Sequence, residues 1–145
     1  MSQGTRAHQM AMYVVYESPL QMLCDSPSRY RQEEDCVRFI ARIPTSWDET
    51  RVLEAKVGDY LVLARRKGEN WYLAAMTDWT AREFDVDLSF LPAGSYRLES
   101  VADGINAARH AQDHRFETRA VNAETRLILK LAPGGGWAGI ISPDR

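Results

Sequence analysis

The sequence predicts a mainly β fold: an antiparallel β-sandwich of about eight strands preceded by two α-helices. Apolar and polar residues alternate in residues 84–90 and 126–131, which is the period of a strand with one solvated face. Turn-forming clusters recur at short intervals, at residues 67–70, 92–94, 103–104 and 133–136. Short strands joined by tight turns are typical of a two-sheet sandwich.

The first predicted helix covers about residues 6–18. Its apolar residues lie on more than one face, so we expect neighbours on several sides of the helix. Pro19 follows Ser18 and predicts that the helix kinks or restarts there.

A second predicted helix starts at Ser26-Pro27 and ends before Pro44. Acidic residues near its beginning and arginines near its end suit the helix dipole. We expect this helix to bury Tyr30, Val37 and either Ile40 or Ala41.

Two cysteines, Cys24 and Cys36, raise the question of a disulfide. If the chain turns at residues 26–27 between antiparallel helices, Cys36 lies about 14 Å along the second helix from that turn. A disulfide needs its Cα atoms within about 7 Å. We therefore expect two free thiols, buried or half-buried.

Residues 60–64 and 71–76 are apolar on both faces, which predicts central strands that are covered on both sides. The glycines at 134–136 predict a sharp turn into a last strand, residues 137–141. The turn at Asp103-Gly104 is interpreted as structural, with Gly104 supplying a positive φ angle.

Composition argues against two classes of partner. The 145 residues carry a formal net charge of -2 with acidic and basic residues interspersed, so no large basic field is available for nucleic acid. The longest apolar stretches, residues 11–16 and 60–64, fall far short of the roughly 20 residues that cross a membrane. We expect neither nucleic acid nor a membrane as partner.

Two patterns could carry chemistry. Asp85 and Asp87 point to one face of a predicted strand, and glycoside hydrolysis uses two carboxyl groups. We interpret this pair as the solvated face of the strand, because no pocket-forming loop adjoins it. His110 and His114 have a spacing that suits a metal only on a helix, and we expect an exposed loop instead. The sequence therefore predicts no catalytic, cofactor-binding or metal-binding residue.

The tryptophans divide into core and contact candidates. Trp71 and Trp137 lie within predicted strands and are expected in the core. Trp79 lies in a turn between strands, where a large aromatic side chain is a candidate for carbohydrate or interdomain contact. Residues 44–50 separate the helices from the strands, and they predict two domains, residues 1–45 and 46–145. We expect Trp47 to be largely buried between these domains, with Asp48 satisfying backbone donors at the turn.

Four segments carry a family resemblance: residues 4–9 (GTRAHQ), 13–20 (YVVYESPL), 47–50 (WDET) and 64–68 (ARRKG). Together they resemble the carboxyl-terminal end of glycoside hydrolase family 97. The resemblance implies a bacterial exo-acting α-glycosidase, either an inverting α-glucosidase or a retaining α-galactosidase, that is periplasmic or secreted. Its members combine an amino-terminal β-sandwich, a (β/α)8 barrel and a terminal antiparallel β-domain.

By this resemblance, residues 1–45 would be the helical remnant of the catalytic barrel, and residues 46–145 the terminal β-sandwich. The family's catalytic carboxylates and calcium-binding glutamates lie earlier in the barrel, and no position here matches them. No cofactor is therefore expected in this chain, and calcium is expected only in the parent enzyme. Thr5, Arg6 and His8 would lie near the barrel rim that faces the substrate.

The resemblance implies a non-catalytic fragment whose sandwich supports the barrel of an α-glycosidase. Its expected partners are the missing barrel and, through the parent enzyme, an oligosaccharide. Without the barrel, we expect a homodimer formed through Met12, Tyr13, Val15 and Tyr16 of the first helix. The alternative is a free-standing carbohydrate-binding β-sandwich with a helical arm.

Overall fold

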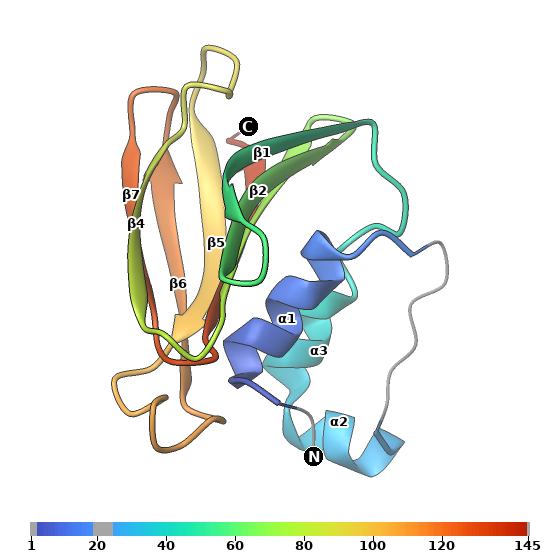
Figure 1. Cartoon of the computed structure of the whole chain (residues 1–145). Helices are drawn as coiled ribbons and strands as arrows, with labels where there is room; N and C mark the ends of the chain where they lie inside the picture. Colours follow the sequence, from blue (N-terminus) through green and yellow to red (C-terminus); the bar gives the residue numbers. More distant parts are fainter. Residues whose placement is uncertain (1–2, 19–24, 145) are drawn as a thin grey trace.

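The computed structural model describes residues 3–18 and 25–144, and it contains three helices and eight strands (Figure 1). Their bounds, in chain order, are α1 Arg6–Val15, α2 Pro27–Gln32, α3 Glu34–Ile40, β1 Glu49–Lys56, β2 Tyr60–Lys67, β3 Asn70–Thr77, β4 Arg82–Asp87, β5 Tyr96–Asp103, β6 His114–Val121, β7 Arg126–Leu131 and β8 Gly136–Pro143.

The strands form two antiparallel sheets. The large sheet has the order β1-β2-β3-β8-β5-β6, and the small sheet pairs β4 with β7. Figure 1 shows the small sheet on one side of the large sheet and the helices on the other. The prediction of a mainly β fold with about eight antiparallel strands after helices is confirmed.

Each face of the large sheet borders a separate hydrophobic cluster. Leu73 and its neighbours at alternate positions face the small sheet, while Tyr72 and Ala74 face the helices. Residues 62–64 and 71–75 are all buried, which confirms the prediction that β2 and β3 are covered on both sides. Trp71 and Trp137 are buried in the cluster between the sheets, as expected.

Helix α1 packs directly on the sandwich. Its buried residues form one stripe against β3, β5 and β8: Ala7, Met10, Ala11, Val14 and Val15. The expectation that Val15 lies uncovered for self-association is therefore wrong, because the sheet of the same chain covers it. Met12 and Tyr13 are half-buried, and Tyr16 is 55% exposed. The helix ends at Val15, three residues earlier than predicted.

The second predicted helix is broken in two. Glu33, with φ -122° and ψ 48°, separates α2 from α3, and it forms a 2.6 Å ion pair with Arg6. Helix α3 buries Cys36 and Phe39, whereas the residues predicted to be buried are half-buried (Tyr30, Val37 and Ile40) or exposed (Ala41). Cys36 is a buried free thiol whose pKa is raised by burial. Cys24 and Pro19 lie outside the described residues.

The Asp103-Gly104 turn differs from its prediction. Gly104 does not have a positive φ angle, so that expectation is wrong. A Cβ atom at Gly104 would lie 2.3 Å from the Asp113 side chain, and glycine is required there by close approach.

None of the described helices is long and apolar enough to cross a membrane.

Candidate interface between the helices and the sandwich

The first turn of α1 is fixed to the sandwich through Thr5. The Thr5 hydroxyl caps the helix by accepting a 3.1 Å hydrogen bond from the His8 backbone N–H. The same hydroxyl donates a 2.5 Å hydrogen bond to Asp103 at the end of β5. The Thr5 backbone N–H donates to the Gly134 carbonyl at 2.9 Å. Thr5 is only 2% exposed, so this attachment lies inside the molecule.

Asp103 connects three parts of the chain. One carboxylate oxygen accepts the Thr5 hydroxyl, and the other accepts the backbone N–H groups of Ala132 at 2.9 Å and Gly136 at 3.1 Å. Burial raises the pKa of the Asp103 carboxyl, while its hydrogen bonds act in the opposite direction. Helix α1, strand β5 and the turn between β7 and β8 are thus joined at one side chain.

The glycines between β7 and β8 allow this turn to approach the helix. His8 Nδ1 lies 3.0 Å from the Gly135 carbonyl oxygen, within hydrogen-bond distance. A Cβ atom at Gly136 would lie 2.4 Å from the His8 Cα atom. The glycines therefore serve close packing against the first turn of α1, in addition to forming the predicted turn.

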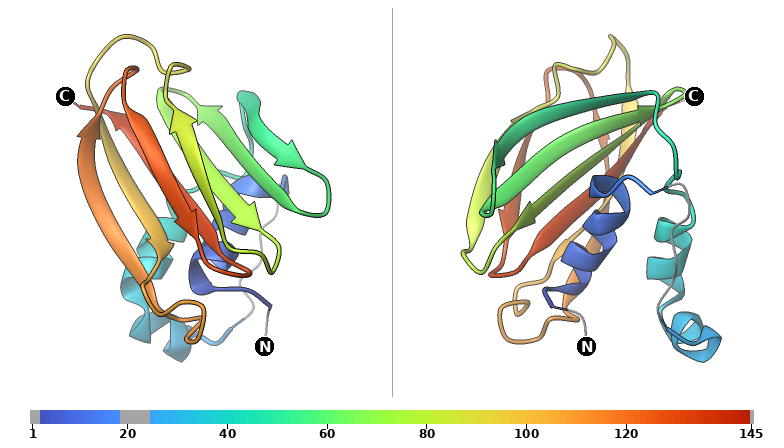
Figure 2. Two further views of the ribbon diagram at one scale, coloured as in Figure 1. Left: turned by 60° about the vertical axis from the view of Figure 1, so that its left-hand side comes forward. Right: turned by 45° about the vertical axis from the view of Figure 1, so that its right-hand side comes forward.

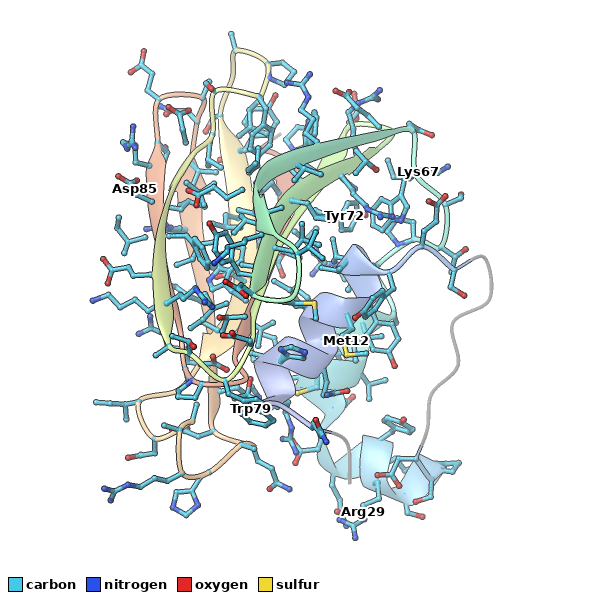
Figure 3. All side chains as sticks on the ribbon, viewed as in Figure 1. Met12, Arg29, Lys67, Tyr72, Trp79 and Asp85 are labelled. Carbon is cyan, nitrogen blue, oxygen red and sulfur yellow. The ribbon has the colours of Figure 1, made fainter. Side chains whose placement is uncertain are left out.

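The Trp79 ring lies against the same turn. A Cβ atom at Gly134 would lie 2.7 Å from the ring, although 66% of Trp79 is exposed. Figure 3 shows Trp79 near the first turn of α1. The structure thus brings Trp79 and His8, two of the predicted contact residues, to one turn. The third, Arg6, pairs with Glu33 beside it.

The opposite end of α1 is fixed by Arg65 of β2. Its Nη2 atom donates a 3.0 Å hydrogen bond to the Val15 carbonyl, which places a cation at the carboxyl end of the helix. Arg65 is only 7% exposed, and burial lowers the pKa of its guanidinium. The Nε and Nη1 atoms have no hydrogen-bond partner among the described residues. Trp47 forms a cation–π contact with this guanidinium, with 5.4 Å between its ring centroid and the Arg65 Cζ atom.

Trp47 packs against the hydrophobic cluster between the helices and the large sheet, and it is half-buried there. Its ring meets Tyr72 of β3 edge-on, with 5.1 Å between the ring centroids. The Tyr72 hydroxyl in turn donates a 3.2 Å hydrogen bond to the Arg42 carbonyl, just after α3. These contacts attach the segment after α3 to the helix-covered face of β3.

Asp48 acts on the sandwich side of the seam. Its carboxylate accepts the Gly68 backbone N–H at 2.8 Å and pairs with Lys67 at 3.3 Å. The Gly68 hydrogen bond, followed by the Lys67 interaction, lowers the pKa of the Asp48 carboxyl. Asp48 therefore satisfies a backbone donor in the turn between β2 and β3.

The predicted carboxylate pair is a solvated face, as expected. Asp85 and Asp87 are exposed and lie on the outer face of the small sheet, where Arg126 pairs with both at 2.9 and 3.8 Å. The structure adds an open groove of about 650 Å³ between β1 and β4, which both carboxylates border. The sequence had indicated no pocket there.

The two histidines do not form a metal site. His110 is exposed in the loop before β6, whereas His114 begins that strand and lies 3.4 Å from the Cys36 sulfur. Across residues 3–18 and 25–144, no group of three or more His, Cys, Asp or Glu side chains could hold a metal ion.

Asp103 and Arg65 are the interface residues that the sequence reasoning missed. The sequence places Asp103 in a turn, and its partners Thr5 and Gly136 are distant in sequence. Arg65 gave a usable signal, because a charged residue directly follows an apolar run predicted to be a fully covered strand. Such a position requires a buried partner for the charge.

The fold is a two-sheet antiparallel β-domain with helix α1 attached to the outer face of its large sheet at both ends. A family model for the glycosyl-hydrolase 97 carboxyl-terminal, oligomerisation domain matches residues 46–142. The chain belongs to glycoside hydrolase family 97.

The chain is similar over most of its length to much larger proteins. It is 51% identical over 138 residues to a retaining α-galactosidase of Bacteroides thetaiotaomicron, which covers 95% of this chain and 21% of the relative. It is 29% identical to a probable retaining α-galactosidase of Streptomyces bingchenggensis, over 92% of this chain and 20% of the relative. The chain thus spans about a fifth of the length of these relatives.

A solved structure shows the same fold. The family 97 enzyme of Pseudoalteromonas sp. strain K8, in complex with acarbose, matches 99% of this chain and 23% of its own, with a TM-score of 0.95 and 39% identity. The arrangement of helices on the sandwich is therefore shared with a family member.

Proposed function

We propose that this chain is the carboxyl-terminal, non-catalytic part of a bacterial α-glycosidase and that it supports the catalytic barrel through α1. The observation that carries this proposal is that the two sides of α1 differ in burial. One side of α1 is buried on the sandwich and fixed at both ends, by Thr5 and by Arg65. The other side presents Met12 and Tyr16, which a barrel would cover.

The attachments make the sandwich a rigid support for the helix. A helix held at one end could tilt, whereas hydrogen bonds at Thr5 and Val15 fix both its position and its direction. Met12 on the helix is half-buried and Tyr16 directly after it is 55% exposed, and together they offer an apolar surface for a further protein layer. The barrel helix and the sandwich would therefore move as one body.

We propose an α-galactosidase as the parent enzyme. Support comes from the 51% identity to a retaining α-galactosidase, against 39% to the Pseudoalteromonas enzyme crystallised with acarbose. The catalytic carboxylates and any calcium are assigned to other parts of the parent. The family's description as an oligomerisation domain further supports a homodimer.

Complementation tests the support role. The Bacteroides thetaiotaomicron relative would be produced without the segment that matches this chain and co-expressed with the chain. We expect the truncated relative to lose soluble aryl α-galactosidase activity and the added chain to restore it. Full activity of the truncated relative on its own would contradict the proposal.

Substitutions on the free side of α1 sharpen this test. Met12→Asp with Tyr16→Asp places charges where the barrel should pack, so restoration should fail. Ile128→Asp is the matched control, because Ile128 is 50% exposed on β7, on the side away from the helices. Circular dichroism verifies that each variant is folded. Restoration by the helix variant as complete as by the control would show that α1 does not meet the barrel.

A second candidate function, carbohydrate binding at Trp79, is favoured by the 66% exposure of this side chain. Aromatic rings provide a broad apolar surface on which a sugar can stack. Titration with α-galacto-oligosaccharides, followed by tryptophan fluorescence, tests it. Binding that Trp79→Ala abolishes would support this function, and an unchanged spectrum at millimolar sugar would exclude it.

A further inference from the structure

Strand β6 is an uncovered edge of the large sheet. All six residues from Arg115 to Ala120 are exposed, and the contact of Phe116 with Phe39 of α3 leaves 41% of Phe116 exposed. The left view of Figure 2 shows β6, in orange, at the outer border of the sheet. An exposed edge strand presents unpaired backbone groups to which another strand can add.

The opposite edge of the sheet is protected. Strand β1 contains a β-bulge between Val52 and Glu54, where its pairing with β2 shifts register. Bulges are a common way to prevent edge-to-edge pairing. Pairing of β6 with β5, in contrast, runs without interruption from His114 to Val121. The two edges therefore differ in their readiness to accept a strand.

The backbone groups at the free edge can be identified. The Gly104 N–H donates to the Asp113 carbonyl at 3.0 Å, directly before the β5–β6 ladder. Hydrogen-bonded pairs alternate in an antiparallel ladder, so Arg115, Glu117 and Arg119 direct their backbone groups toward β5. The pairing of β5 with β8 supports this assignment. The Asp144 N–H donates to the Ser95 carbonyl, so odd-numbered residues of β5 direct their backbone groups toward β8 and even-numbered ones toward β6. The N–H and C=O groups that face outward belong to His114, Phe116, Thr118 and Ala120.

Charges on β6 are complementary to a second, antiparallel copy of the strand. Arg115, Glu117 and Arg119 lie on one face in the order positive, negative, positive, and none forms an ion pair with another described residue. With Thr118 on a two-fold axis, each Glu117 lies opposite the Arg119 of the second copy. A register shifted by one pair would place Glu117 opposite Glu117, which is unfavourable.

We propose that β6 is the self-association edge of this domain, pairing antiparallel with β6 of a second copy about Thr118. This inference rests on the homodimer included in the proposed function and adds the surface that forms it. Two identical surfaces related by a two-fold axis form a closed dimer, in which no β6 edge remains free to pair with a third copy. The register also overlaps almost the whole of β6.

The helix-facing side of β6 fits the same arrangement. Phe116 is 41% exposed, and its ring packs on Phe39 of α3 with 5.9 Å between centroids. Phe116 would lie opposite the Ala120 of the second copy, a small residue that leaves room for the ring. A groove of about 290 Å³ between α3 and β6 opens beside it. Pairing therefore covers the exposed ring while forming the ladder.

Sedimentation velocity of the isolated chain and its variants tests the proposal. Thr118→Pro removes an outward N–H and leaves the ladder to β5 intact, so it should yield a monomer. Glu117→Arg replaces two attractive cross-strand pairs by repulsive ones and should raise the dissociation constant about tenfold or more. Adding Arg119→Glu restores complementary pairs and should restore the dimer. Glu83→Arg makes the same charge change on β4, outside β6, and should leave the dimer unaffected.

The outcomes separate this surface from self-association itself. If the wild type is a dimer and both Thr118→Pro and Glu117→Arg dimerise equally well, β6 is not the interface, although the homodimer stands. A wild-type chain that stays monomeric at about 100 μM would overturn both. Neither result affects the complementation test of barrel support. Thermal unfolding by circular dichroism confirms that the compared variants are folded.

Discussion

The Thr5 hydroxyl donates a 2.5 Å hydrogen bond to the Asp103 carboxylate across 98 positions of sequence. This bond joins the first turn of α1 to the end of β5. Since the carboxylate also accepts the N–H groups of Ala132 and Gly136, one acidic residue holds the helix and the turn before β8 in place.

Replacing Asp103 by alanine should lower the free energy of unfolding by about 2–4 kcal/mol, because it breaks three hydrogen bonds and leaves two backbone donors unsatisfied. Thr5→Val removes only the hydroxyl and should cost about 1–2 kcal/mol. Urea unfolding measures both. Asp85→Ala, on the solvated small sheet, is the control and should have little effect. A loss for Asp103→Ala no larger than that of the control would show that this attachment is not stabilising.

Stability should depend on pH through Asp103. Burial raises the pKa of its carboxyl in the folded protein above the ordinary value of 3.8. Its stabilising contribution is then complete below pH 3.8 and is lost as the pH rises through the raised value. The free energy of unfolding of the wild type should therefore fall relative to that of Asp103→Asn as the pH rises above 3.8 and through the raised pKa. Urea unfolding at several pH values measures this difference, and a constant difference would contradict the expectation.

Trp47→Ala should destabilise the chain by about 2–4 kcal/mol, since the ring packs on Tyr72 and covers the buried Arg65 guanidinium. Thermal unfolding followed by circular dichroism measures the effect. Trp47→Phe keeps part of the packing, so its thermal midpoint should lie between those of the wild type and Trp47→Ala. An unchanged midpoint for Trp47→Ala would mean that the segment after α3 is not held by this ring.

Gly134→Ala should be destabilising for two reasons, a φ angle of 63° and a collision with the Trp79 ring. Gly58→Ala carries only the first cost, because Gly58 has a φ angle of 86° with nothing within 4 Å. The difference between the two variants measures the collision. In a Trp79→Ala background this difference should shrink, and a double-mutant cycle that shows no coupling would exclude the contact.

The isolated chain should hydrolyse neither α-glucosides nor α-galactosides, because a glycosidase needs a positioned pair of carboxyl groups. Asp85 and Asp87 are both paired with Arg126 on an exposed sheet. Nitrophenyl α-glycosides provide the assay. Turnover that disappears in Asp85→Asn or Asp87→Asn would contradict the non-catalytic assignment.

The strands were predictable because their signal is local. Alternation at residues 84–90 and the apolar run at 71–76 indicate which faces are covered without knowledge of the partner strand. The ion pair between Glu33, at the helix break, and Arg6, near the chain start, was not predictable in this way. The role of Asp103 was not predictable either, because it depends on Thr5, and neither was the face of α1 that is buried on the sheet. These features come from packing between distant segments, which periodicity does not report.

The helix-covered face of the large sheet bears on where this domain can be cut. A protein that begins at residue 46, as the family model does, would place that face in water: Leu63, Tyr72, Ala74, Val101, Ala138 and Ile140. Each large apolar side chain exposed in this way costs about 1.5–3 kcal/mol. The right view of Figure 2 shows how α1 lies along this face. We therefore expect a transplantable module for chimeric glycosidases to need Thr5 and α1, because a junction at Pro44 would separate α1 from the strands that it covers.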